Sequence, residues 1–204
     1  MSRKCLALLI FLICVLVFFL IFLKNRNSYI RNDINIVPIL EPTEAIEKVY
    51  PILEFEQRIN KKAFGAYITP KHSPVQPERF SGFHTGVDVE YTDVEGEIKV
   101  LAVCDGEIVL SKWVLGYGGT VVLKCQNKYI IYGHLKLDSI NKNLKVTKGE
   151  QLAILGQGGT KETDFERKHL HFGIHKDTID LRGYVQNQNE LNEWIDPLST
   201  LIVF

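Results

Sequence analysis

The chain has 204 residues, of which 46% are hydrophobic, and its 24 Lys and Arg residues are balanced by 24 Asp and Glu residues. This length accommodates one domain of ordinary size and an additional segment, but not two full domains. No excess of basic residues favours nucleic acid as a partner. The composition also excludes a disordered chain, a collagen-like repeat and a protein with several membrane spans.

The N-terminus carries an unbroken apolar run, residues 5–23. A helix of these 19 residues would be about 28 Å long, close to the hydrocarbon thickness of a bilayer at about 30 Å. Arg3 and Lys4 precede the run, and no small-residue cleavage site follows it. We therefore expect residues 1–23 to form an N-terminal transmembrane helix that anchors the chain by a single pass. A cleaved export signal is the alternative.

Residues 24–63 predict a linker between this anchor and the main domain. The first part of the linker is polar and contains two prolines, which favours an extended chain. Thr43 is a suitable N-cap for a helix extending to Ile59, although Pro51 would kink or end such a helix.

Residues 64–204 predict a domain built from β-strands. The stretch 64–80 contains three prolines and is expected to run irregularly over the surface. Beyond it, short runs rich in β-branched and aromatic residues recur between Gly, Asn and Asp turns. The expected strands are 86–90, 98–103, 107–114, 120–124, 129–132, 151–155 and 169–175. Regularly spaced short strands without long amphipathic helices indicate an all-β domain, either a sandwich or a barrel.

Two of the four cysteines, Cys104 and Cys125, lie in strand-like runs that flank residues 116–119. If these runs pair as a hairpin centred near residue 114, the two cysteines lie opposite one another. A cross-strand disulfide is then compatible with the geometry, and an exported domain would permit it. Two buried free thiols are the favoured alternative.

Two sequence patterns place imidazole and carboxylate groups on a common face. His84 and Asp88 are four residues apart, which puts them on the same side of an extended segment. His169 and His171 are two residues apart in an apolar run, so both rings point to one side of a strand while Leu170 points to the other. Neutral imidazoles and carboxylates are ligands of catalytic zinc sites, which leave a fourth position for water. His84, Asp88 and one histidine of the pair therefore form a candidate metal site.

Each pattern also has a structural interpretation. A histidine and an aspartate at this spacing often occur by chance, and a buried pair such as His169 and His171 needs polar partners in any fold. His134, at the end of an expected strand, is by itself typical of a core or surface residue. His72 and His175 show no such pattern, and we interpret both as structural.

Three motifs occur in order along the chain: GFHTGVD at 82–88, YGHL at 132–135 and HLHFG at 169–173. Together they closely resemble the three motifs of the lysostaphin/LytM-type zinc metallopeptidases. The resemblance covers roughly residues 64–197. It implies an all-β, two-sheet barrel-sandwich fold of the duplicated hybrid motif type.

The resemblance also implies His84, Asp88 and His171 as zinc ligands, and His134 and His169 as catalytic residues that do not bind the metal. Zinc lowers the pKa of a coordinated water and polarises the scissile carbonyl. One histidine can take the proton of the water, and the other can hydrogen-bond the developing oxyanion. The sequence does not decide between them, but we favour His169 as the base.

The usual substrate of this family is the peptide part of bacterial peptidoglycan. The resemblance therefore implies a membrane-anchored zinc metalloendopeptidase that cuts peptide crosslinks of the wall. Access to the wall requires the catalytic domain to lie outside the cytoplasm, with the N-terminus on the inner side of the cell membrane. One alternative is a non-enzymatic, membrane-tethered regulator that binds the wall and activates another hydrolase. A secreted lysin is the alternative if the N-terminal segment is cleaved. The sequence gives no signal for oligomerisation.

Two further features have more than one interpretation. Residues 64–80 form a wall or lid of the substrate groove, or they pack along a sheet edge. Trp113, Tyr117 and Trp194 form a binding platform or, as is commoner for aromatic residues, belong to the core.

Overall fold

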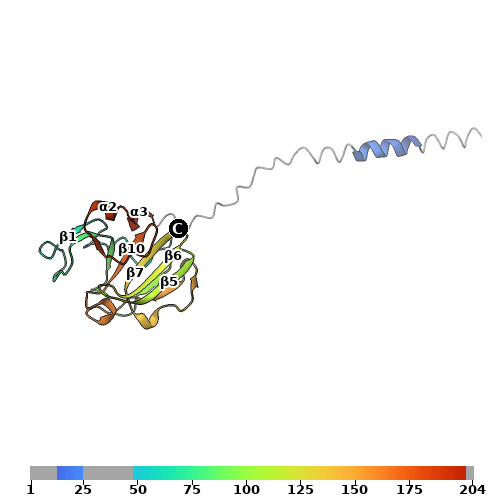
Figure 1. Cartoon of the computed structure of the whole chain (residues 1–204). Coiled ribbons are helices and arrows are strands. Elements are labelled where there is room, and N and C mark those ends of the chain that lie inside the picture. The colour runs from blue at the N-terminus through green and yellow to red at the C-terminus, as the bar shows by residue number, and fades with distance from the viewer. Residues whose placement is uncertain (1–12, 25–47, 201–204) are drawn as a thin grey trace, which may run out of the picture. The chain divides into compact units, whose positions relative to one another are not determined.

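The computed structural model describes residues 13–24 and 48–200, and the chain divides into two compact units, Met1–Ala45 and Ile46–Phe204 (Figure 1). In the first unit, residues 13–24 form a helix with exposed side chains. Residues 1–12 of the predicted anchor, which spans 1–23, and residues 25–47 of the predicted linker lie outside the described residues. Within the part of the chain that is described, no helix has both the length and the apolar character needed to cross a membrane.

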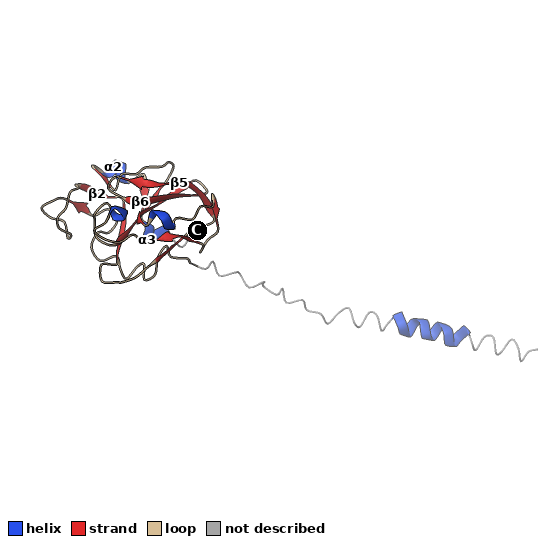
Figure 2. Ribbon diagram, turned by 90° about the horizontal axis from the view of Figure 1, so that it is seen from below, coloured by secondary structure: helices blue, strands red, loops and turns tan. Residues whose placement is uncertain are grey.

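The described part of the second unit consists mainly of β-strands, drawn in red in Figure 2, with a few short helical turns. In chain order the elements are β1 (Tyr67–Ile68), β2 (Gly82–His84), β3 (Gly86–Glu90), β4 (Lys99–Leu101), β5 (Gly106–Val114), β6 (Gly118–Cys125), β7 (Lys128–Leu135), η1 (Leu137–Ser139), β8 (Lys145–Val146), β9 (Gln151–Ile154), η2 (Lys161–Thr163), β10 (His169–His175), β11 (Tyr184–Val185), α2 (Gln188–Leu191), β12 (Trp194–Ile195) and α3 (Pro197–Thr200).

The strands are arranged in antiparallel sheets. The largest has seven strands in the order β12–β10–β7–β6–β5–β8, with β3 paired to β10. A three-stranded sheet has the order β1–β2–β11, and β4 pairs with β9. β10, β7, β6 and β5 lie side by side in Figure 1. The mainly β architecture confirms the predicted class. The β4–β9 pair forms a third sheet, in addition to the two that were expected.

The predicted strands agree closely with the structure. β3 and β10 have the predicted bounds, and β6 and β7 extend beyond the predicted runs at both ends. β4 is shorter than its predicted run. The alternation of apolar side chains and the turn residues was therefore sufficient to place these elements.

The helix predicted from Thr43 is absent from residues 48–59, which form turns, while its first residues lie outside the described part of the chain. The carbonyl of Pro51 accepts a hydrogen bond from the backbone N–H of Leu101 at 2.8 Å. Ile52 and the nearby Phe55 are both buried in the core. Tertiary contacts, together with a proline that cannot donate a backbone hydrogen bond, thus replace the expected helix.

Strand β10 lies between β3 and β7 and orients the histidine pair. His171 is paired with Asp88 of β3 on one side and with Gly133 of β7 on the other. Leu170 is fully buried in the main hydrophobic cluster, so the opposite face of the strand carries His169 and His171. The predicted orientation of the pair is confirmed.

A second, smaller apolar cluster contains Tyr117, Val122, Ile131 and Trp194. Trp194 is 3% exposed and packs its ring edge-to-face against His175. Of the two interpretations of Trp194, the structure supports the core.

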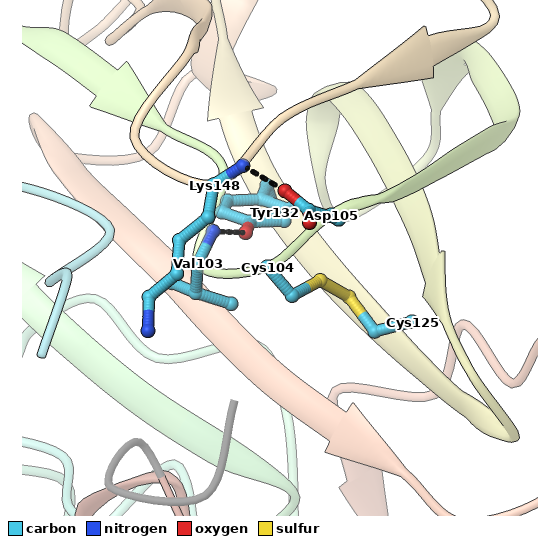
Figure 3. Close-up of a disulfide and its surroundings, with 6 residues drawn as sticks. All are labelled: Val103, Cys104, Asp105, Cys125, Tyr132 and Lys148. Carbon is cyan, nitrogen blue, oxygen red and sulfur yellow. Dashed lines mark hydrogen bonds between the residues drawn. A yellow bond between two sulfur atoms is a disulfide. The ribbon is translucent and has the colours of Figure 1, made fainter. Parts of the chain in front are cut away.

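Cys104 and Cys125 form a disulfide with their Cα atoms 6.2 Å apart, shown in Figure 3. The preference for two free thiols was therefore wrong. Cys104 lies two residues before the start of β5 and Cys125 ends β6, so the antiparallel hairpin brings the two residues together at its open end. Beside the disulfide, Asp105 accepts a hydrogen bond from the backbone N–H of Lys148 at 2.7 Å (Figure 3).

Replacing both cysteines by alanine is expected to lower the free energy of unfolding by about 3 kcal/mol. The reason is that removing a crosslink across a loop of this size returns conformational entropy to the unfolded chain. Urea denaturation of fragment 46–204 measures the change. Reductant should bring the wild type close to the variant and leave the variant unaffected. Equal midpoints for the oxidised wild type and the variant would contradict this prediction.

Candidate metal centre

Three side chains from neighbouring strands converge at one point: His84 ends β2, Asp88 lies in β3 and His171 lies in β10. His84 Nε2 lies 3.1 Å from His171 Nδ1 and 3.2 Å from Asp88 Oδ1, and His171 Nδ1 lies 3.1 Å from Asp88 Oδ1. Ligands at zinc–nitrogen distances in a tetrahedron are about 3.3 Å apart. All three residues are at most 4% exposed. The group therefore fits a metal ion.

In each of the two imidazoles, one ring nitrogen faces the cluster and the other contacts a neighbouring group. His84 Nδ1 is 3.2 Å from the carbonyl of Ala63, an acceptor, so it carries the proton and Nε2 is free to bind. On the other side of His171, Nε2 lies 3.5 Å from the hydroxyl of Tyr117. His171 Nδ1 is the nitrogen that faces His84 and Asp88, and it is therefore the atom that can bind a metal.

Asp88 uses its two carboxylate oxygens differently. Oδ1 faces the two imidazoles, whereas Oδ2 accepts a hydrogen bond from Arg167 Nη2 at 2.7 Å. Burial alone would raise the pKa of this carboxyl, but interactions with the surrounding histidines hold it well below its usual value. Asp88 is therefore an anion, as a metal ligand must be.

His134 and His169 lie beside this group, with their ring centroids 4.1 Å apart. His134 Nδ1 is 3.1 Å from the carbonyl of Thr163, and His169 Nδ1 is 2.8 Å from the carbonyl of Arg167. Both Nδ1 atoms therefore carry the proton, and both Nε2 atoms present a lone pair. Burial lowers the pKa of His134 to about 3 and that of His169 well below its usual value, so both rings are neutral.

A β-bulge in β7 positions His134. Between Gly119 and Val121 of β6, the pairing partner moves from Leu135 to Tyr132, so β7 contains one extra residue at this point. His134 has a φ of 64°, which is rare for a non-glycine residue. The bulge turns the imidazole out of the regular alternation and toward His169.

The site opens into a cavity of about 310 Å³. Its lining includes Asp88, His134, His169 and His171, together with Phe80, Leu115, Tyr117, Leu181 and Tyr184. Phe80, at the end of the proline-containing stretch, stacks on Tyr184 with ring centroids 5.5 Å apart. Tyr184 in turn lies 5.2 Å from the ring of His84. The stretch 64–80 thus contributes one wall of the cavity, and Tyr117 also belongs to the site.

The wall is anchored by a buried ion pair. Lys62 Nζ lies 2.5 Å from Glu78 Oε2, and the two side chains are only 5% and 3% exposed. Lys62 also donates to the hydroxyl of Tyr184 at 2.9 Å, and Glu78 accepts from the backbone N–H of Phe80 at 3.0 Å. The pair thus connects the ring of Tyr184, which packs against His84, to the segment that carries Phe80.

The structure brings together all five residues singled out in the sequence: His84, Asp88, His134, His169 and His171. His72 lies exposed in the proline-containing stretch, and His175 packs against Trp194. The sequence did not indicate Lys62, Arg167 or Tyr184. A signal for Arg167 did exist, because it lies two residues before His169 and therefore on the same side of an extended chain.

The sequence model of peptidase family M23 matches residues 82–188, just over half of the chain. The match runs from β2 to the start of α2 and includes all five of these residues. The chain therefore belongs to peptidase family M23.

Solved structures share the fold. A chain of the complex of SpoIIIAH and SpoIIQ is 17% identical, the match covers 74% of this chain and 97% of that one, and the TM-score is 0.50. The catalytic domain of lysostaphin, an antimicrobial peptidase from Staphylococcus simulans, is 21% identical over 72% of this chain and 96% of that one, with a TM-score of 0.49. The protein cbpa from L. salivarius REN is 20% identical over 69% and 83% of the two chains, with a TM-score of 0.46. No curated protein matches the chain.

Glu78→Gln is expected to lower the free energy of unfolding by about 3 kcal/mol, because it leaves the buried ammonium of Lys62 without a counter-charge. The double variant Lys62→Met/Glu78→Gln removes both charges and should regain part of this loss. Urea denaturation of the three proteins measures both effects. The predicted role of the pair is wrong if Glu78→Gln is as stable as the wild type, or if the double variant is less stable than the single one.

Proposed function

We propose that the protein is a zinc metalloendopeptidase that hydrolyses peptide bonds in the crosslinks of bacterial peptidoglycan. The observation that carries this proposal is the triangle of His84, Asp88 and His171 beside two neutral histidines in a cavity. Membership of peptidase family M23 supports the same reaction class. Two imidazoles and one carboxylate form a ligand set that zinc uses in catalytic sites.

When bound by His84, Asp88 and His171, zinc would act as a Lewis acid and acidify a water molecule. The chain itself supplies the groups that move the proton. His169 Nε2 and His134 Nε2 are both unprotonated, and each can accept a proton from the attacking water. The ring that accepts it then carries a donor at Nε2, which can protonate the leaving amine.

We favour His169 as the base. Its Nε2 lies 3.6 Å from Asp88 Oδ2, so the carboxylate stabilises the positive charge that the ring acquires. The proton gained at Nε2 also leaves the hydrogen bond from Nδ1 to the Arg167 carbonyl intact. His134 is the second assisting histidine.

The proposed location is the cell membrane, with residues 1–23 as a single-pass anchor and the catalytic domain outside the cytoplasm. The disulfide between Cys104 and Cys125 supports this location, because disulfides persist in oxidising compartments. A tether would raise the local concentration of the site near the wall and limit how far it can reach.

Fragment 46–204 is expected to bind one equivalent of zinc and to release peptides from purified peptidoglycan. His171→Ala should lose the metal, because it removes one of three ligands. His169→Ala should keep the metal and lose peptide release by a factor of about 100 to 10,000. Metal analysis and mass spectrometry of the released fragments measure both. His72→Ala, in which an exposed histidine is removed, is the matched control and should resemble the wild type.

The alternatives correspond to distinct results. If the wild-type fragment binds no zinc, the proposed enzymatic function is refuted, and the tethered regulator that binds the wall is favoured. Stoichiometric zinc without release from any wall preparation would refute peptidoglycan as the substrate.

The full chain is expected to be found in the membrane fraction of cells, and a variant that lacks residues 1–23 in the soluble fraction, because the apolar run is the proposed anchor. Fractionation with immunodetection checks this, and the mass of the mature protein reports cleavage. A mature protein that lacks the N-terminal segment would show that this segment is a cleaved export signal and not an anchor, and would favour the secreted lysin.

A further inference from the structure

Arg167 contacts the candidate metal centre through both its side chain and its backbone. It lies two residues before His169, and its side chain is 11% exposed. Neither zinc binding nor peptide hydrolysis, as proposed above, assigns this residue a role. Its contacts with Asp88 and His169 nevertheless connect a metal ligand to the proposed base.

The guanidinium spans two buried carboxylates. Arg167 Nη2 donates to Asp88 Oδ2 at 2.7 Å and to Glu90 Oε1 at 2.6 Å. Arg167 Nε lies 2.9 Å from each oxygen of Glu90. Asp88 and Glu90 lie two residues apart on β3, and both are at most 5% exposed. Arg167 thus compensates two neighbouring buried anions in a fixed, planar geometry, and the more exposed Lys61 Nζ lies 3.6 Å from Glu90 Oε2.

The hydrogen bond to Asp88 determines which oxygen remains available. A carboxylate without such a bond can rotate and coordinate a cation through both oxygens. Here Oδ2 is bonded to Arg167, so Oδ1 alone lies within 3.2 Å of both His84 Nε2 and His171 Nδ1. The carbonyl of the same residue accepts the hydrogen bond from His169 Nδ1 at 2.8 Å. Arg167 therefore contacts the candidate metal ligand Asp88 through its side chain and the proposed base His169 through its backbone carbonyl.

We propose that Arg167 is a positioning residue of the candidate metal centre. Its side chain restricts Asp88 to coordination through one oxygen, and its backbone carbonyl orients the His169 ring beside Asp88. This inference rests on the proposed metal site and deepens it. Lysine cannot replace arginine here, because an ammonium is a single point of charge and cannot span Asp88 and Glu90 in two directions. Hydrogen-bond partners of metal ligands commonly contribute a factor of 10 to 100 to metal affinity.

The test uses the full-length protein loaded with cobalt(II) in place of zinc. Arg167→Gln and Arg167→Lys are expected to lower the intensity of the visible cobalt absorption bands, because coordination by a second oxygen of Asp88 raises the coordination number. Arg167→Lys, which keeps the charge, should also weaken zinc binding by at least tenfold in a chelator competition. Arg58→Lys is the matched control: the Arg58 side chain bridges Glu54 and Asp93, reaches Glu90 only at the backbone carbonyl and contacts no candidate metal ligand, so both readouts should equal those of the wild type.

The outcomes separate positioning from a merely structural role. A cobalt spectrum and a zinc affinity unchanged in Arg167→Lys would overturn the proposal, whatever the thermal stability of the variant. The same holds if Arg58→Lys changes both readouts to the same extent. If Arg167→Gln does not fold, Arg167→Lys still tests the proposal, because this variant retains the buried positive charge.

A kinetic measurement tests the role of Arg167 toward His169, whose Nδ1 donates to the Arg167 carbonyl. With a peptide substrate, Arg167→Lys should lower kcat and leave KM nearly unchanged, because loss of the side-chain contacts to Asp88 and Glu90 releases the backbone carbonyl of residue 167 that orients His169. A rise in KM alone would contradict the role toward His169. The metal readouts remain valid if no peptide substrate is cut, so failure of the proposed function is distinguishable from failure of this inference.

Discussion

Strand β10 is hydrogen-bonded along both of its edges, to β3 and to β7, and the candidate centre depends on this double pairing. One ladder sets His171 opposite Asp88, and the other sets it opposite Gly133, next to the bulged His134. A slip of either ladder by one residue would turn alternate side chains to the wrong face. The buried apolar face of β10 opposes such a slip, because a slip would expose Leu170 and its neighbours. Packing of the core thereby sets the geometry of the polar face.

Backbone carbonyls, more than side chains, hold the imidazoles. His84, His134 and His169 each direct Nδ1 toward a carbonyl, those of Ala63, Thr163 and Arg167 respectively. A carbonyl accepts but does not donate, and it does not titrate. It therefore fixes each tautomer independently of pH, in contrast to a carboxylate partner. His171 is the exception, since its ring nitrogens contact the side chains of Tyr117 and Asp88.

Local sequence patterns predicted the strands and the histidine pair well, because alternation over a few residues reports directly which side chains share a face. The same patterns brought His84 and Asp88 together correctly. The sequence could not indicate the contact between Arg167 and Asp88, because this contact depends on which strands pair across about 80 residues of chain. For the same reason the helix expected from Thr43 failed over its described part: long-range burial of Ile52 and Phe55 outweighed local propensity.

The hairpin formed by β5 and β6 has two ends with different chemistry. The disulfide closes the open end, whereas the turn at the other end supplies Leu115, Gly116 and Tyr117 to the cavity. Gly133 accommodates the Tyr117 ring, since a Cβ there would lie 2.6 Å from Cδ1 of that ring. The disulfide therefore restrains the end of the hairpin that lies away from the cavity. Any opening of the hairpin at that end would have to propagate along both paired strands before it disturbed the Tyr117 ring beside the candidate metal ligands.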